Sequence, residues 1–156
     1  RKNNNPRTAK EIANIFKLDV TSATKGCKNA IGIINTIEKD FNISDKIVLC
    51  TTSPKDFINR FCSKLNINKE FTKLCEFISL LVEKNELIPE NTPHSIAAGI
   101  IYLIIQIFEL TITKKEVNAV SGISEVTINK CYKKLDEIKE KLIPAVLCKK
   151  YNIVLH

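Results

Sequence analysis

Residues 113–135 read TKKEVNAVSGISEVTINKCYKKL and predict two short helices joined by a tight turn. Thr113 and Glu116 have the T-x-x-E spacing of a capping box, in which the hydroxyl and the carboxylate satisfy each other's free backbone amides. Gly122 is suited to leave the first helix with a positive φ, and Ser124 can cap the start of the second helix. The stretch therefore carries start and stop signals for a pair of helices.

The second predicted helix has an outer side dominated by polar and basic residues. Helical spacing places four residues on that side: Val126, Asn129, Lys130 and Lys133. This layout is that of a helix-turn-helix, whose second helix can enter a DNA major groove. A corner between two helices of an ordinary core gives a similar pattern, so both interpretations stay open at this point.

The beginning of the chain repeats this pattern 105 positions earlier, without a gap. The matching pairs are Thr8 with Thr113, Lys10 with Lys115, Glu11 with Glu116, Ile12 with Val117, Ile15 with Val120, Leu18 with Ile123 and Lys25 with Lys130. Lys17 stands where the later copy has Gly122, in a turn that glycine would suit better. An internal duplication with a unit of about a hundred residues, the size of one domain, explains the repeat. Chance similarity between two capped amphipathic helix pairs is the alternative.

Apolar residues recur at helical spacing along the chain, and nothing reads as a strand-turn-strand unit, so we expect an all-α fold. Residues 95–110 are apolar on nearly every side, which places that helix at the centre of a bundle. The expected organisation is 1–41 as the C-terminal part of a first repeat, 42–52 as a linker, 53–142 as a complete second repeat and 143–156 as a tail that packs back on the body.

Composition excludes several classes of protein. Hydrophobic residues at 44% and charged residues at 26% are typical of a globular chain. Six cysteines without a C-x-x-C pair and only two histidines argue against zinc and disulfides, and suggest buried thiols, with Cys62, Cys75 and Cys131 in the core. The apolar run 96–108 has 13 residues, fewer than the about 20 of a membrane span, and we expect no signal peptide. We expect no membrane association, no metal or cofactor and no small-molecule substrate.

Charge is concentrated at the two ends of the chain. The net charge of +7 comes with 21 lysines and only three arginines, a bias that by itself says little about partners. Residues 1–31 carry seven cations and two anions, residues 32–110 carry eight and ten, and residues 111–150 carry nine and five. Both basic ends coincide with the helix-turn-helix candidates, which a uniform bias would not produce. A carboxylate cluster at residues 136–140 is explained by intrahelical pairing with lysines, so we expect no enzyme.

A helical repeat with a buried third helix, duplicated and ending in a helix-turn-helix, strongly resembles the C-terminal core of transcription initiation factor IIB. That core is built from two cyclin-like repeats. Four stretches carry the resemblance: Pro6–Ile12 (PRTAKEI), Asp56–Leu65 (DFINRFCSKL), Thr92–Leu103 (TPHSIAAGIIYL) and Gly122–Lys130 (GISEVTINK). The resemblance implies a complete cyclin-like five-helix bundle, preceded by the last two helices of a first cyclin-like repeat.

The resemblance also implies a nuclear transcription factor that binds TATA-binding protein and promoter DNA and positions RNA polymerase II. Base contacts in that family come from a valine and an arginine three residues apart, and these positions fall on Val126 and Asn129. Because asparagine suits adenine whereas arginine reads guanine, we expect an altered sequence preference. Backbone phosphates would be contacted by the lysines of the helix pair: Lys114, Lys115, Lys130, Lys133 and Lys134. In the first repeat, Lys25 and Lys28 would serve DNA or TATA-binding protein.

Two other functions fit the same pattern. One is the related factor that serves RNA polymerase III, and the other is a cyclin-like protein-interaction module that does not bind DNA. Since the first repeat lacks the core partners of its two helices, we also expect those helices to pack loosely, to swap with a neighbour or to contact the second repeat unnaturally.

Overall fold

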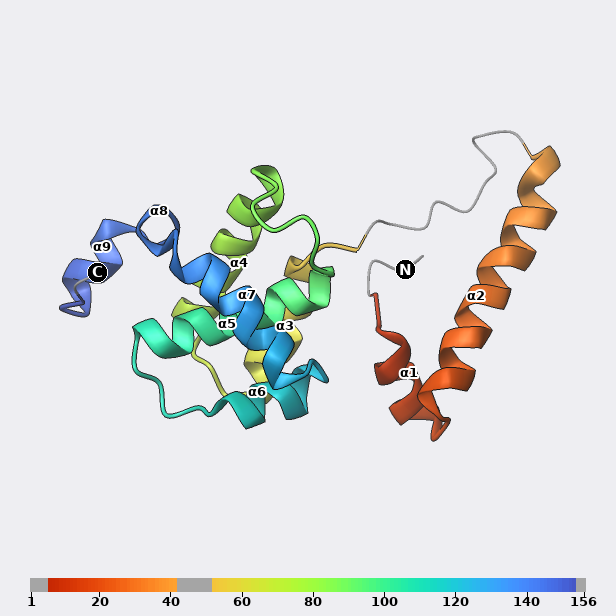
Figure 1. Cartoon of the computed structure of the whole chain (residues 1–156), viewed down its shortest axis with the longest axis horizontal. Helices are drawn as coiled ribbons and strands as arrows, with labels where there is room; N and C mark the ends of the chain where they lie inside the picture. Colours follow the sequence, from red (N-terminus) through yellow and green to blue (C-terminus); the bar gives the residue numbers. More distant parts are fainter. Residues whose placement is uncertain (1–5, 42–51, 154–156) are drawn as a thin grey trace. The chain divides into compact units, whose positions relative to one another are not determined.

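The computed structural model describes residues 6–41 and 52–153 (Figure 1). Every element in these residues is a helix, which confirms the all-α prediction. The chain divides into two compact units, Arg1–Thr52 and Ser53–His156. Most of the predicted linker, residues 42–51, lies outside the described residues, as do residues 1–5 and 154–156.

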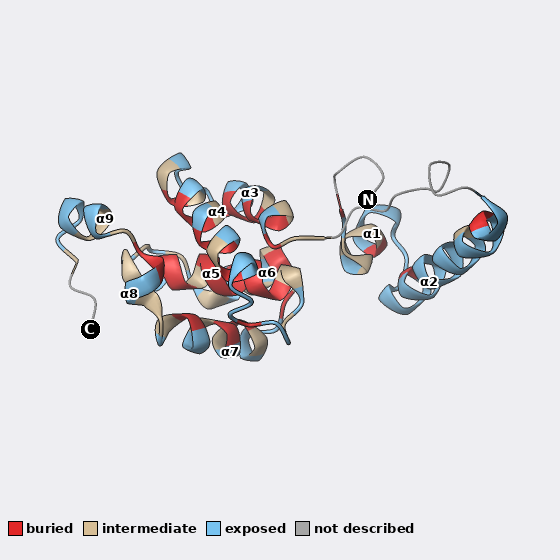
Figure 2. Ribbon diagram, turned by 90° about the horizontal axis from the view of Figure 1, so that it is seen from above, coloured by how far each residue is buried: buried red, intermediate tan, exposed pale blue. Residues whose placement is uncertain are grey.

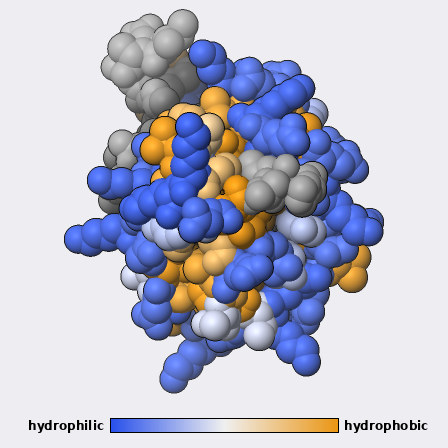
Figure 3. Space-filling view, turned by 90° about the vertical axis from the view of Figure 1, so that its left-hand side faces the viewer, coloured by the Kyte–Doolittle hydropathy of each residue, from blue (hydrophilic) through white to orange (hydrophobic). Residues whose placement is uncertain are grey.

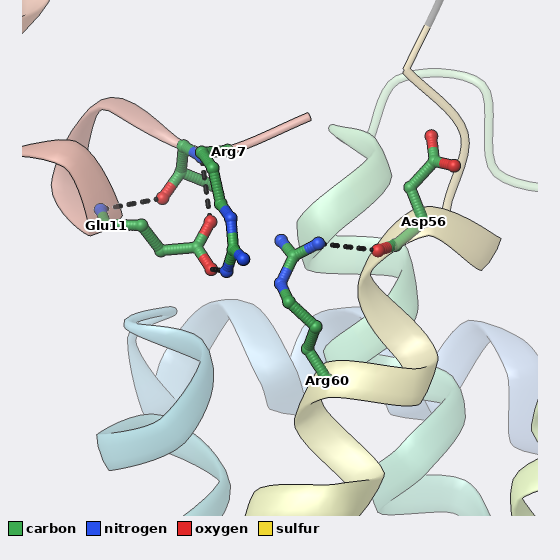
Figure 4. Close-up of polar contacts among 5 residues, drawn as sticks. Arg7, Glu11, Asp56 and Arg60 are labelled. Atoms are coloured by element: carbon green, nitrogen blue, oxygen red, sulfur yellow. Dashed lines mark hydrogen bonds and ion pairs between the residues drawn. The ribbon is translucent and has the colours of Figure 1, made fainter. Parts of the chain in front are cut away.

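The first unit is a pair of helices, α1 (Ala9–Phe16) and α2 (Val20–Ile37), with a short 3-10 turn, η1 (Glu38–Asp40), at its end. The predicted capping box forms at the start of α1. The Thr8 amide donates to Glu11 Oε2 at 2.8 Å, and the Glu11 amide donates to Thr8 Oγ1 at 3.1 Å (Figure 4). Lys17 ends α1 with φ 54°, so it takes the left-handed conformation that its alignment with Gly122 predicts. Asp19 then caps α2 by accepting from the Ser22 amide at 2.8 Å.

Much of the apolar surface of the first unit is exposed. Ala13 and Ala23 are its buried helical residues, and most of α2 is exposed along its length (Figure 2). The exposed large apolar side chains of this unit are Ile15, Phe16, Leu18, Val20, Ile31, Ile33, Ile37 and Phe41. These helices thus have an apolar side that the described residues leave largely uncovered.

The second unit is a helical bundle arranged around one central helix. Its elements are α3 (Lys55–Lys64), α4 (Lys69–Lys84), α5 (Pro93–Ile107), α6 (Lys114–Ser121), α7 (Glu125–Asp136), α8 (Lys139–Leu142) and α9 (Ala145–Lys150). Helix α5 is buried from Ser95 to Ile101 and again at 103–105, and Figure 2 shows it among the surrounding helices. Burial of apolar area contributes about 25 cal/mol per Å², so α5 is the main source of stability in this unit.

A close approach between α5 and α7 fixes the position of α7 in the bundle. A Cβ atom placed on Gly99 of α5 would lie 2.5 Å from the Cβ of Cys131 on α7. No larger residue fits there without moving one of the helices. Since Ile128, Cys131 and Leu135 of α7 are all fully buried, the inner face of this helix is set firmly against α5.

Helix α3 begins with a local polar arrangement of its own. The Ser53 amide donates to Asp56 Oδ2 at 2.8 Å. One turn later, Arg60 Nη1 donates to the carbonyl oxygen of Asp56 at 2.8 Å (Figure 4). The Arg60 guanidinium also lies 5.1 Å from the ring centroid of Phe57. These contacts hold the first turns of α3 together at the start of the second unit.

The chain after α7 packs back on the body of the second unit. Helix α7 ends at Asp136, and a short further helix, α8, follows from Lys139 to Leu142. Beyond it, the Tyr151 ring lies 5.3 Å from the rings of both Phe71 and Phe108. Lys150 Nζ donates to Glu70 Oε1 at 2.7 Å. Hydrogen bonds from Lys150 and then from Tyr151 hold the pKa of the Glu70 carboxyl below its usual range.

The surface of the second unit mixes both kinds of side chain. Apolar side chains gather in a band between hydrophilic ones on the face that Figure 3 presents. Exposed large apolar residues of this unit include Phe77 and Leu80 on α4 and Val146 on α9.

The three cysteines predicted to lie in the core are confirmed as buried, namely Cys62, Cys75 and Cys131. The wider expectation of buried thiols is wrong for Cys27, which is exposed on α2 because that side of the helix has no covering element among the described residues. None of the described helices combines the length and the hydropathy that a membrane span requires. Within residues 6–41 and 52–153, no three His, Cys, Asp or Glu side chains are grouped to hold a metal ion.

Candidate nucleic-acid interface

Helix α6 starts at the capping box that the sequence predicts. The Glu116 amide donates to Thr113 Oγ1 at 3.3 Å, and the Thr113 amide donates to Glu116 Oε2 at 2.7 Å. Hydrogen bonds from the Thr113 hydroxyl and backbone amide hold the pKa of the Glu116 carboxyl below its ordinary value. The start of α6 is therefore fixed by its own side chains.

The turn between α6 and α7 is fixed by a glycine and two polar side chains. Gly122 has φ 72°, the left-handed conformation expected of it. Asn118 Nδ2 donates to the carbonyl oxygen of Ile123 at 2.6 Å. Ser121 Oγ donates to the carbonyl oxygen of Val117 at 2.6 Å and accepts from the Ile123 amide at 3.1 Å. The spacing of Asn118 and Ser121 in the sequence does not predict these hydrogen bonds, because their partners are backbone atoms whose positions depend on the turn itself.

Helix α7 presents the predicted outer side to solvent. Ser124 caps the helix by accepting from the Thr127 amide at 3.2 Å, as predicted. Val126 is 66% exposed although it is apolar, Asn129 is half-buried, and Lys130 and Lys133 are exposed. These four residues form the α7 ridge, which faces away from the buried side of α7. A convex helical ridge of this kind has the shape that a major groove admits.

The lysines predicted to contact phosphates differ in their surroundings. Lys134 forms an ion pair with Glu90, and both side chains remain about half exposed. Lys115, Lys130 and Lys133 are exposed, and no ion pair joins them to another described residue. An exposed ammonium without a fixed partner is available to a phosphate at little desolvation cost. The region around the α7 ridge thus offers several exposed cations.

Lys114 has a different position from the other lysines. Its Nζ donates to Asn129 Oδ1 at 3.0 Å, linking the first turn of α6 to the middle of α7. The same ammonium lies 5.0 Å from the ring centroid of Tyr102 on α5. The Tyr102 ring in turn meets the Tyr132 ring edge-on at 5.3 Å. Lys114 on α6 is therefore held beside Asn129 of the α7 ridge.

In the first unit, Lys25 and Lys28 both lie on α2 and are exposed. Lys28 lines a shallow hollow along α2, whose other lining residues include Gly32, Ile33 and Ile37. The two lysines therefore stand beside exposed apolar side chains rather than on a purely polar ridge like that of α7.

Comparison with known proteins gives one family and a consistent set of relatives. The model of the transcription factor TFIIB repeat matches residues 49–138. A putative transcription initiation factor IIB-like protein of Acanthamoeba polyphaga mimivirus is 38% identical over 133 residues, covering 85% of this chain and 28% of that protein. Transcription initiation factor IIB of Dictyostelium discoideum is 31% identical over 142 residues, covering 89% of this chain and 40% of that protein. Transcription initiation factor IIB of Oryza sativa subsp. japonica is 30% identical over 158 residues, covering 98% of this chain and 47% of that protein. The chain spans less than half the length of each of these relatives.

Proposed function

Because this chain belongs to the transcription factor TFIIB family, we propose that it binds promoter DNA through the α7 ridge as part of a transcription initiation factor. In this proposal the chain also binds TATA-binding protein, helps to position RNA polymerase II and acts in the nucleus. Membership in a family of transcription initiation factors supports these roles.

The observation that carries the proposal is the exposure of the α7 ridge. Val126, Lys130 and Lys133 of this ridge are exposed and do not contribute to the buried core, because the buried face of α7 lies on its opposite side. Such a ridge suits a groove whose walls are phosphates and whose floor carries polar base edges and methyl groups. Lys115, Lys130 and Lys133 would supply the phosphate contacts that set affinity.

A double charge reversal tests the role of these lysines. We expect Lys130→Glu combined with Lys133→Glu to weaken binding to a TATA-containing duplex by about tenfold or more at about 50 mM salt. The plot of log affinity against log salt concentration has a negative slope, and its magnitude should decrease by about two, one for each lost phosphate contact. Gel-shift titrations with and without TATA-binding protein over a series of salt concentrations measure both quantities.

The matched control places the same charge change elsewhere on the second unit. Lys64 on α3 and Lys73 on α4 are also exposed. The Lys64→Glu, Lys73→Glu variant should lose affinity only through the change in net charge, by much less than the ridge variant. Equal losses in the two variants would contradict a specific role for the α7 ridge. Failure of the unaltered chain to shift the duplex with TATA-binding protein at low salt would contradict DNA binding altogether and favour a protein-interaction module.

A further inference from the structure

The second unit has a cavity of about 450 Å³ whose lining includes none of the four residues of the α7 ridge. Its walls come from three parts of the chain: the last turn of α5 and the residues after it, the end of α7 with the start of α8, and the residues that follow α9. These parts are brought together by the packing of the bundle. A cavity of this volume is within the range of pockets that bind small ligands or single side chains of a partner.

Two of the three charged side chains that line the cavity are carboxylates with room for a further hydrogen bond. Glu109, just after α5, is exposed and has no hydrogen bond or ion pair with another described residue. Asp136, the last residue of α7, accepts from Lys139 Nζ at 3.0 Å through Oδ1. A carboxylate accepts through both of its oxygens, so Asp136 Oδ2 is available as well. This lining suits a ligand that donates hydrogen bonds.

The charges around the cavity favour a cation. The one ammonium among the described lining residues, that of Lys139, is already paired with Asp136. Glu109 lies beyond the C-terminal end of α5, where the helix dipole places partial negative charge. Burial, followed by the Asp136 carboxylate, raises the pKa of the Tyr132 hydroxyl, so this group stays uncharged and can itself accept a hydrogen bond.

Aromatic rings complete the walls of the cavity, namely those of Phe108, Tyr132 and Tyr151. The Tyr151 ring already has the Lys150 ammonium 5.3 Å from its centroid, which leaves Phe108 and Tyr132 for a ligand. Tyr132 is held by Tyr102, whose ring meets it edge-on at 5.3 Å. Aromatic faces attract cations, and a planar guanidinium stacks on them in a way that an ammonium cannot.

We propose that this cavity binds the guanidinium group of an arginine side chain from a protein partner. The guanidinium would donate to Glu109 and to Asp136 Oδ2, with its plane against the Tyr132 ring. Arginine suits the site better than lysine because its five N–H donors lie in one rigid plane, which matches carboxylates beside an aromatic wall. The inference goes beyond DNA binding and does not depend on it, since it uses no residue of the α7 ridge.

The test uses the whole chain labelled with nitrogen-15 and three short peptides as probes. Each probe is an acetylated and amidated tripeptide with glycine at both ends and arginine, citrulline or lysine in the centre. Citrulline has nearly the shape of arginine but carries no charge. We expect amide shifts at residues 106–109, 132–139 and 151–153, with the arginine peptide bound about tenfold more tightly than the citrulline peptide and also more tightly than the lysine peptide.

Matched variants assign the binding to the cavity. Glu109→Gln keeps the size of the side chain and removes its charge, so it should weaken binding of the arginine peptide by about tenfold and leave the citrulline peptide unaffected. Glu83→Gln makes the same change at an exposed residue of α4 outside the cavity and should alter neither. Asp136→Asn is a second variant within the cavity. The amide spectrum of each variant without peptide establishes that it is folded.

Each alternative result contradicts the proposal in a different way. Equal binding of the arginine and citrulline peptides, or shifts that lie away from the cavity, would overturn it. Equal losses in Glu109→Gln and Glu83→Gln would show attraction by overall charge only. A lysine peptide bound as tightly as the arginine peptide would exclude a guanidinium site. None of these measurements contains DNA, so their failure leaves the proposed function intact, and failure of DNA binding leaves this inference intact.

Discussion

The helix pairs α1–α2 and α6–α7 use the same local devices at equivalent positions. Each begins with a threonine–glutamate capping box, at Thr8 in one and Thr113 in the other. Each first helix ends at a left-handed residue, Lys17 with φ 54° and Gly122 with φ 72°. Each second helix is capped by a side chain that accepts from the backbone amide three residues later. These short-range features account for the helix-turn-helix shape in both units.

The pairs differ in what covers their apolar faces. In α7, Ile128 and Leu135 are fully buried against the rest of the second unit. In α2, Ile33 is 59% exposed and Ile37 is 60% exposed. Local capping therefore sets the form of a helix pair, while burial of its apolar face sets its stability. A helix pair that binds DNA bases must be held rigidly. Of the two pairs, only α6–α7 has its inner face buried among the described residues.

The largest predicted effect concerns the buried face of α7. Ile128→Ala should lower the free energy of unfolding of the second unit by about 2–5 kcal/mol, because Ile128 has no exposed surface and its removal leaves a cavity. All three tyrosines lie in the second unit, so tyrosine fluorescence during urea unfolding reports on that unit.

The matched variant in the other pair is Ile33→Ala. Because Ile33 is largely exposed on α2, we expect a change within about 0.5 kcal/mol, measured by hydrogen exchange of the α2 amides. A loss as large as that of Ile128→Ala would show that the face of α2 is covered in solution and would break the comparison.

A smaller effect is expected from replacing one glycine by alanine in each unit, Gly99 on α5 and Gly26 on α2. Gly99→Ala places a Cβ within 2.5 Å of Cys131 Cβ, so it should destabilise the second unit by about 1–3 kcal/mol. Gly26→Ala in α2 meets no atom within 4 Å and should stabilise α2 by about 0.5–1 kcal/mol, because alanine favours helix more than glycine does. Thermal unfolding followed by circular dichroism and by tyrosine fluorescence checks both signs. Stabilisation by Gly99→Ala would show that α5 and α7 are not packed as closely as the structure has them.

A smaller effect than that of Gly99→Ala is predicted for the two left-handed turn residues. Lys17→Gly should stabilise α1–α2 by about 0.5–1 kcal/mol, since glycine adopts positive φ without the penalty that lysine has. The reciprocal Gly122→Ala should cost the α6–α7 turn about 1 kcal/mol. Hydrogen exchange of the amides on either side of each turn measures both changes. Loss of protection around residue 17 in Lys17→Gly would contradict the left-handed turn there.

Much of this arrangement follows from short-range sequence patterns. The capping boxes, the turn at Gly122 and the cap at Ser124 depend on residues within four positions of one another. The central position of α5 follows from its own consecutive apolar residues. The contact of Lys114 with Asn129 joins residues 15 positions apart. That contact depends on how α6 and α7 cross, which no local pattern specifies.

Two further features depended on packing as well. The fit of Gly99 against Cys131 requires knowing which residues of α5 and α7 meet, and the exposure of Cys27 requires knowing what covers α2. The sequence predicts both α2 and α7 as helices with an apolar face, but the apolar faces alone do not show which of the two is covered by other elements. Burial is decided by neighbouring elements, and for α2 the described residues provide few.

The most direct test of the central claim is methylation interference on the complex of this chain, TATA-binding protein and promoter DNA. Dimethyl sulfate modifies guanine N7, which lies in the major groove that the α7 ridge is proposed to enter. We predict interference at guanines upstream of the TATA element with the unaltered chain, and its loss with Asn129→Ala while binding of TATA-binding protein persists. Interference that is absent upstream, or that is identical in the two proteins, would contradict the account.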